Sequence, residues 1–176
     1  LQRGKMGRKS TKQNKNIYQT SREEAGFTRE KASEVIGFIS PDRIERIESE
    51  KSEPQPDEIL AMEKCYSKTG LCNYYCSHEC PIGQKYIPEV HIKELSQITL
   101  EMLASLNSIE NDKNRWIEIT VDGQISDDEI PDFISIQDKL QKISLAVDSL
   151  QLWMQDMIAK GNINQEKLEE YRQKNK

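Results

Sequence analysis

Hydrophobic positions recur every three or four residues through most of the chain, the spacing that places side chains on one face of an α-helix. In the first part of the chain these stretches are short, and glycine or proline separates them. They predict four helices, at about 17–25, 29–36, 41–50 and 57–66. Gly26 and Gly37 are expected to end the first two helices.

The residues that precede two of these helices are good N-caps. Thr28 and Ser40 each stand directly before a helical stretch, and Pro41 occupies a first helical position, where its missing N–H is not needed. Ile44 and Ile47 fall on the inner side of the third helix. The fourth helix is expected to bury Ile59, Leu60 and either Met62 or Tyr66. Short helices joined by such short turns predict a compact helical unit.

The second half of the chain carries a longer pattern. Its apolar residues fall on a strict heptad at Phe133, Ile136, Leu140, Ile143, Val147, Leu150, Met154 and Met157. A preceding helix at about 92–120 carries a patchier stripe of Leu95, Met102, Leu106, Ile109 and Trp116. Asp122 and Gly123 predict the turn between the two helices. We therefore expect a long antiparallel helical hairpin or coiled coil.

Two helices alone would leave half of each apolar stripe uncovered. A second hairpin would cover it, so we expect a homodimer formed through residues 91–160. The alternative is an intramolecular bundle, in which the N-terminal helices pack on the hairpin.

The pair of helices around Gly37 has the arrangement of a helix-turn-helix. A turn of about four residues, 37–40, joins two short helices, and the second helix exposes Asp42, Arg43, Glu45 and Arg46. Two short helices joined by a tight turn that contains glycine are typical of this motif. In DNA-binding examples the second helix lies in the major groove.

Residues 28–37, from Thr28 to Gly37, and residues 40–48, followed by Lys51 and Pro54, resemble the phage-repressor (XRE-type, Cro/CI-like) helix-turn-helix family over about 14–67. The resemblance implies an all-α, lambda-repressor-like domain of four to five helices that binds DNA and regulates transcription. Glu48 matches an acidic position that is usually structural in the family. The family usually has glycine where Glu50 stands, and one residue fewer before Glu48, so Phe38 or Ile39 looks inserted.

The resemblance also implies which residues contact DNA. By position, Arg29 would contact a phosphate or a base edge, and Pro41, Asp42, Arg43 and Arg46 would face the groove. Arg43 and Arg46 are the main candidates for base reading, because arginine can donate two hydrogen bonds to guanine, worth roughly 1–3 kcal/mol of discrimination.

Charge is distributed unevenly over the 176 residues, whose formal net charge is -5. Residues 1–16 hold six basic side chains and no acid, and we expect Lys9, Lys12 and Lys15 of this flexible arm to contact the DNA backbone. Residues 40–53 hold three basic and five acidic side chains. Binding that relies on the arm would be steeply salt-dependent.

All four cysteines lie within sixteen residues, together with one histidine, which predicts a candidate metal site at Cys65, Cys72, Cys76, Cys80 and His78. The group contains no Cys-x-x-Cys pair, and one continuous helix over 72–80 would hold its ends about 12 Å apart. Zinc is one interpretation. Buried thiols that act as small hydrophobic residues, an iron–sulfur cluster and a redox-switched disulfide are the others.

These observations divide the chain into a basic arm at 1–16, a helix-turn-helix domain at 17–67, a cysteine-rich linker at 68–90 and a helical hairpin at 91–176. The sequence shows no apolar run near 18 residues and no secretory signal, so we expect no membrane segment and a cytoplasmic protein. It shows no catalytic constellation. We expect a dimeric, sequence-specific transcriptional regulator of double-stranded DNA. The alternatives are a protein-interaction adaptor with a vestigial helix-turn-helix, and a metal- or redox-responsive regulator.

Overall fold

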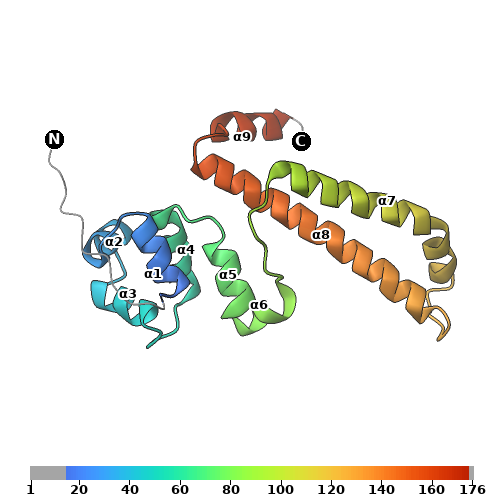
Figure 1. The fold of residues 1–176 in the computed structure, drawn as a ribbon, viewed down its shortest axis with the longest axis horizontal. Coiled ribbons are helices and arrows are strands. Elements are labelled where there is room, and N and C mark those ends of the chain that lie inside the picture. Colours follow the sequence, from blue (N-terminus) through green and yellow to red (C-terminus); the bar gives the residue numbers. More distant parts are fainter. Residues whose placement is uncertain (1–14, 175–176) are drawn as a thin grey trace. The chain divides into compact units, whose positions relative to one another are not determined.

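A computed structural model describes residues 15–174, and every regular element in that range is a helix (Figure 1). The helices are α1 (Ile17–Glu24), α2 (Arg29–Ile36), α3 (Pro41–Glu48), α4 (Pro56–Tyr66), α5 (Leu71–His78), α6 (Pro81–Tyr86), α7 (Leu95–Thr120), α8 (Ile130–Ala159) and α9 (Gln165–Lys174). The all-α prediction is confirmed. Lys9 and Lys12 of the predicted arm lie outside the described residues.

The chain forms two compact units, which divide between Glu89 and Val90. The N-terminal unit contains α1–α6, and the C-terminal unit contains α7–α9. No helix within 15–174 is both long enough and apolar enough to span a bilayer.

Local capping explains where the first helices begin. The side chains of Thr28 and Ser40 accept hydrogen bonds from the backbone N–H groups of Lys31 and Arg43, as the sequence predicts for N-caps. Gly37 ends α2 in the left-handed region, at φ 87°. These three residues set the boundaries of the helix-turn-helix pair.

The end of α3 differs from the expectation. The helix stops at Glu48, two residues before the predicted Glu50. Glu50 itself takes the left-handed conformation, with φ 60°. The chain therefore makes the turn for which the family uses glycine, although an L-residue is strained in this conformation.

The core of the N-terminal unit lies among α1–α5. Its fully buried side chains include Ile44, Ile47, Ile59 and Met62, and Tyr18, Ala32, Ile39, Tyr66 and Leu71 join them. The expectation for Leu60 is wrong, since this side chain is 65 % exposed. Ile59, Met62 and Tyr66 occupy the inner face of α4, and Leu60 lies about 100° around the helix from Ile59.

The cysteine-rich segment is helical rather than a plain linker. α5 packs against α4 and α6, and Leu71 at its start belongs to the core. Gly83 in α6 lies directly against the backbone carbonyl of Cys76, where a β-carbon would overlap. Residues 71–86 thus form a helix pair attached to the helix-turn-helix core.

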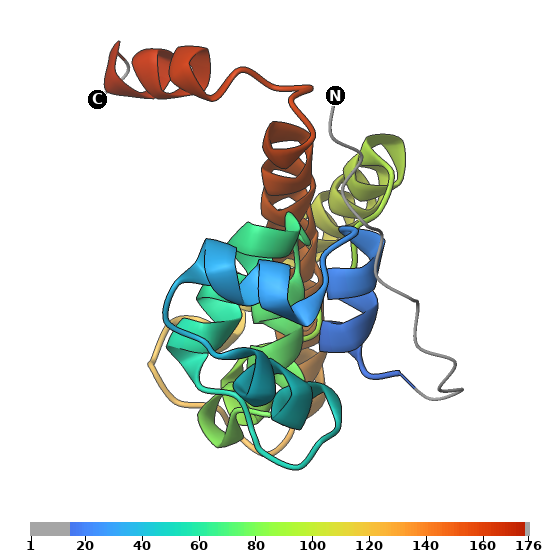
Figure 2. The ribbon, with the colours of Figure 1, turned by 90° about the vertical axis from the view of Figure 1, so that its left-hand side faces the viewer.

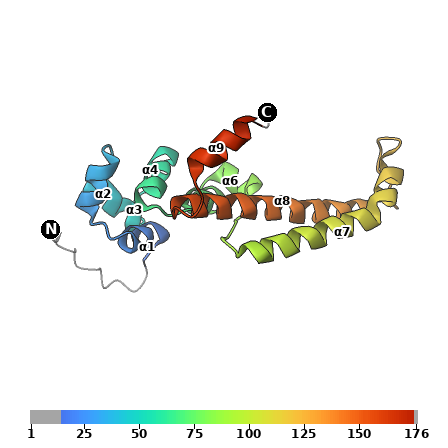
Figure 3. The same cartoon turned by 90° about the horizontal axis from the view of Figure 1, so that it is seen from above.

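In the C-terminal unit α7 and α8 lie side by side as the predicted hairpin (Figure 3). The buried side chains of α7 are Ile98 and Ile119. Two charged contacts join the helices: Arg115 Nε lies 2.6 Å from Asp132 Oδ2, and Lys139 pairs with Asp112.

The heptad stripe of α8 is only partly covered. Ile136 is buried, but Phe133, Leu140 and Val147 are each 38–39 % exposed. The other buried side chains of α8 are Ala146, Ser149, Leu152 and Asp156, none of which belongs to the predicted heptad. The covered face of this helix is therefore rotated from the stripe that the sequence indicates.

Candidate DNA-binding surface

The candidate surface is built on α2, the turn after it and α3, which pack against one another (Figure 2). Ile39 in the turn is buried in the core, whereas its neighbour Phe38 is 61 % exposed. Phe38 is therefore the residue of this longer turn that points away from the core. The helices on either side of the turn, α2 and α3, are each eight residues long.

A buried ion-pair network fixes the end of α3. The carboxylate of Glu48 accepts hydrogen bonds from Arg22 Nη2 at 2.9 Å and from Arg29 Nε at 2.8 Å, and Arg22 Nε donates to its other oxygen. Burial alone would lower the pKa of Arg22, but the hydrogen bond and charge of Glu48 outweigh it, and the pKa is raised. The network joins α1, α2 and α3, which makes Glu48 structural as the resemblance implies.

The side chain of Arg29 is anchored at one atom and partly exposed to solvent. Its Nε points inward to Glu48, yet 36 % of the side chain is exposed at the start of α2. A guanidinium that is anchored at Nε and exposed at its end is suited to contact a phosphate, because its direction is already fixed.

Arg43 is held by the protein itself. Its Nε and Nη2 donate to the two oxygens of Glu58, each at 2.7 Å. Nη1 donates to the Ser52 hydroxyl, and Nη2 also donates to the Glu53 carbonyl at 2.8 Å. The hydrogen bond from Arg43 is the main reason that the pKa of Glu58 is lowered. To donate two bonds to a base, Arg43 would first have to leave Glu58.

Arg46, by contrast, is free. It lies in the last turn of α3 and is exposed, and within residues 15–174 no hydrogen bond or ion pair engages its guanidinium. Asp42 is exposed in the first turn of the same helix, and Pro41 is half-buried beside it. The structure therefore binds the guanidinium of Arg43 within the protein and leaves that of Arg46 unbound by any described residue.

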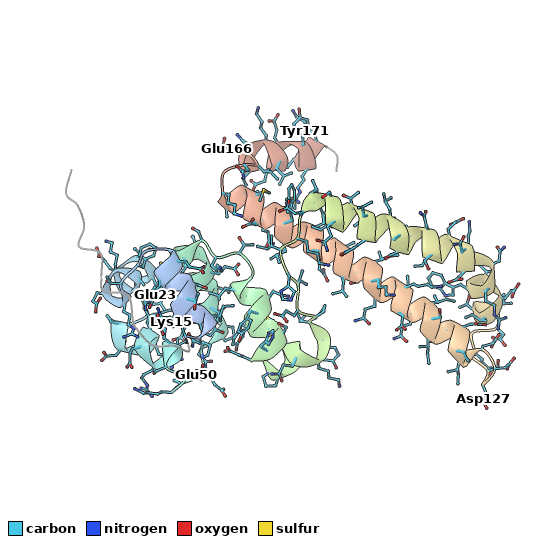
Figure 4. All side chains as sticks on the ribbon, in the orientation of Figure 1. Lys15, Glu23, Glu50, Asp127, Glu166 and Tyr171 are labelled. Carbon is cyan, nitrogen blue, oxygen red and sulfur yellow. The ribbon has the colours of Figure 1, made fainter. Side chains whose placement is uncertain are left out.

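Other cations surround this surface. Lys15 pairs with Glu23 at 2.6 Å in front of α1 (Figure 4), so the one arm lysine that the structure describes is already engaged. Lys31 in α2 and Lys51 after α3 are exposed, and they form ion pairs with Glu34 and Glu45. The sequence analysis assigned neither lysine to the DNA-binding surface, although their place beside the predicted helices was a usable signal.

The cysteines are not gathered into a metal site. All four are free and half-buried, and α5 is continuous through Cys72 and Cys76. Among the described residues no three histidine, cysteine or acidic side chains are placed to share a metal ion. Burial is the main cause that raises the pKa of Cys72 to about 12, and it also raises those of Cys65 and Cys76. Zinc binding by these residues stays a prediction from the sequence.

The comparison with known families agrees with this geometry. Residues 20–69 match the helix-turn-helix family HTH_3, and this part of the chain is an XRE/Cro/CI-type helix-turn-helix domain. No curated protein and no solved structure matches the chain. The matched residues include α2, α3 and α4 completely, together with both partners of the Arg43–Glu58 pair.

Proposed function

We propose that the protein is a sequence-specific transcriptional regulator that acts as a homodimer and reads the major groove of double-stranded DNA with α3. The observation that carries this proposal is the free Arg46 on a helix whose end is locked by Glu48, inside a helix-turn-helix domain. A fixed helix with a free guanidinium offers the geometry that base reading needs.

The contacts differ in kind. Arg46 reads a base, and Arg29 binds a phosphate next to it, since its Nε is anchored and its end is exposed. Arg43 reads a base only in a state that exchanges Glu58 for DNA. Asp42 and Pro41 shape the surface at the start of α3, and Lys9, Lys12 and Lys15 attract the backbone.

The charge balance makes binding sensitive to salt. Residues 40–53 carry three basic and five acidic side chains, so α3 and its tail gain nothing from the phosphates overall. The basic residues at 1–16 supply the attraction. Each phosphate neutralised by a lysine or arginine adds about 0.9 to the slope of log affinity against log salt.

The dimer is proposed to form through the hairpin, within residues 91–160. Phe133, Leu140 and Val147 follow one another at seven-residue spacing on α8, and all three remain exposed. Leu103 and Leu106 are exposed on α7 in the same unit. Apolar side chains repeated along one helix at this spacing are a typical coiled-coil seam, and a second copy would cover them.

The test begins with selection of bound duplexes from random DNA. Affinity for a selected duplex and for an unrelated one is then measured by fluorescence anisotropy, for the wild type and for Arg46→Ala. We expect the variant to lose about 5-fold to 150-fold on the selected duplex, which corresponds to about 1–3 kcal/mol, and much less on the unrelated one. Lys64→Ala is the control, because Lys64 is an exposed lysine in the last turn of α4.

Two results would contradict the proposal. If Arg46→Ala weakens both duplexes to the same extent as Lys64→Ala, then Arg46 contributes only charge and reads no base. If no duplex is enriched, the adaptor becomes the better function. The engagement of Arg43 by Glu58 is the observation that favours this second candidate, since it removes one arginine from the surface.

A further inference from the structure

A cleft of about 360 Å³ opens on the N-terminal unit, and Arg46 is not among its lining residues. It lies where the start of α1, the segment after α3, and the helix pair α5 and α6 meet. Small-molecule sites typically have volumes of roughly 300–1,000 Å³. The cleft therefore has room for a small ligand.

Its charge is negative. Three carboxylates line it: Glu50 and Glu53 from the segment after α3, and Glu79 from the end of α5. No lysine or arginine is among its lining residues, and His78 is the basic side chain present. Figure 4 labels Glu50 at the edge of this unit. A ligand with a positive charge would meet three carboxylates here, and no lysine or arginine of the lining would compete with it.

Aromatic rings form another part of the lining. The ring of Tyr74 stacks on that of His78, with centroids 4.3 Å apart and planes inclined by 15°. Tyr18 meets Tyr74 edge-on at 6.4 Å. Aromatic faces combined with carboxylates are the chemistry that recognises organic cations, because a ring face attracts a positive charge while also contacting methyl or methylene groups.

Two lining groups, Tyr18 and Glu79, lie next to each other and have no lysine or arginine partner among the described residues. Tyr18 is 2 % exposed, and within residues 15–174 its hydroxyl makes no hydrogen bond of ordinary geometry. Burial raises the pKa of this phenol, and the nearby carboxylate of Glu79 raises it further. Glu79 forms no ion pair with a lysine or arginine in the described part of the chain. Burial raises its pKa, and the charges of Glu53 and Glu50 raise it further, while the Tyr18 hydroxyl acts in the opposite direction. A partly buried carboxylate without a cationic partner is costly, and a bound cation would offset the charge of Glu79.

We propose that this cleft binds a small organic cation, with its ammonium group between Glu53 and Glu79 and its apolar body against the ring of Tyr74. The proposal does not depend on DNA binding. The cleft does, however, share residues with the helix-turn-helix domain. Ser52 lines it and also accepts a hydrogen bond from Arg43, and Asn16 lines it and donates to the carbonyl of Ile47 at 2.9 Å. A ligand in the cleft would thus contact the segment that leads out of α3.

The experiment uses the full chain and benzyltrimethylammonium as the probe, with benzyl alcohol as the neutral comparison. Backbone amide NMR shifts during titration locate the binding, and calorimetry gives the affinity. We expect shifts confined to residues 16–18, 50–54 and 74–84. We also expect binding at least tenfold tighter than that of benzyl alcohol.

Variants then separate charge from ring contact. Glu53→Gln together with Glu79→Gln should weaken probe binding at least tenfold. Tyr74→Leu keeps the charges and should weaken it about threefold to thirtyfold. The matched control is Glu34→Gln with Glu166→Gln, which removes the same charge from exposed positions on α2 and α9 and should change nothing.

The proposal is overturned by equal binding of the neutral analogue, by shifts spread over exposed carboxylates in both units, or by unchanged affinity in the cleft variants. Glu53→Gln alone guards against misfolding of the double variant, because Glu53 is exposed. This single variant should still bind the probe severalfold more weakly, and an unchanged affinity for the probe also counts against the site.

Discussion

Removal of the Glu48 carboxylate tests how the helix-turn-helix pair is held together. In Glu48→Ala the guanidinium of Arg22, whose side chain is 8 % exposed, stays buried without its hydrogen-bonded carboxylate, and the nearest remaining one is Glu23, 3.9 Å from Nη2. The loss of one member of a buried ion pair typically costs about 3–5 kcal/mol. Domains of ordinary stability unfold at about 5–15 kcal/mol, so this one substitution should remove a large part of the unfolding free energy of the N-terminal unit.

The assay is urea unfolding at pH 7, followed by the methyl NMR signals of Ile44 and Ile47, which are buried in the N-terminal core. Both tryptophans, Trp116 and Trp153, belong to the C-terminal unit, so their fluorescence follows that unit separately. For Glu48→Ala we expect the methyl signals to report a large decrease in the unfolding free energy of the N-terminal unit. The fluorescence transition should remain where it is in the wild type.

Two companion variants sharpen the result. Glu45→Ala removes an acid from the same helix, but its partner Lys51 is 3.4 Å away in an exposed pair, so the cost should stay below about 1 kcal/mol. Arg22→Met combined with Glu48→Leu removes both charges and should recover part of the loss. If Glu48→Ala costs no more than Glu45→Ala, the network does not hold α3, and the reasoning fails.

Three further predictions concern single features. Glu50→Gly should raise the unfolding free energy by up to about 1 kcal/mol in urea, because relief of the left-handed strain exceeds the flexibility that glycine adds; a destabilised variant would show no such strain. The lowered pKa of Glu58 means that the carboxylate stabilises the fold above its unfolded pKa near 4.3 and loses this effect as the pH falls through the folded value. The wild type should therefore lose more in melting temperature between about pH 5 and 3 than Glu58→Gln, and equal pH profiles would contradict the Arg43 pairing. Leu140→Asp with Val147→Asp should give a monomer in sedimentation, whereas a wild type that is already monomeric would refute the proposed dimer.

Local signals made the helix-turn-helix predictable. Thr28, Ser40 and Gly37 act on their own neighbours through backbone hydrogen bonds and through the freedom of glycine. A sequence displays such signals directly, because cap and helix are adjacent. The boundaries of α2 were therefore predicted to the residue.

The ion pair of Arg43 could not be predicted from the sequence. Its partner Glu58 lies fifteen residues further along the chain, on another helix, and no spacing rule connects the two. From the sequence alone Arg43 and Arg46 looked equivalent on the surface of α3. The difference between them depends on the turn after α3, which brings Glu58 next to the first turn of the helix but not next to the last.

The helical hairpin was predictable as a pair of helices, but the face that each helix buries was not. Ala146 and Ser149 are buried in α8, although neither is strongly hydrophobic and neither belongs to the heptad. Small side chains permit helices to approach closely, and a count of apolar positions overlooks them. The large apolar side chains that such a count selects, Leu140 and Val147, are the ones left partly exposed.

The contact between Gly83 and the carbonyl of Cys76 has a consequence for tracing the ancestry of this chain. Where α5 meets α6, backbone touches backbone, so natural selection can accept only the smallest residue at position 83 for as long as the two helices stay together. Even a change to alanine would push the cysteine-bearing helix aside. In distant homologues an unchanging glycine at this place would mark those that inherited the helix pair, even if every cysteine had been replaced.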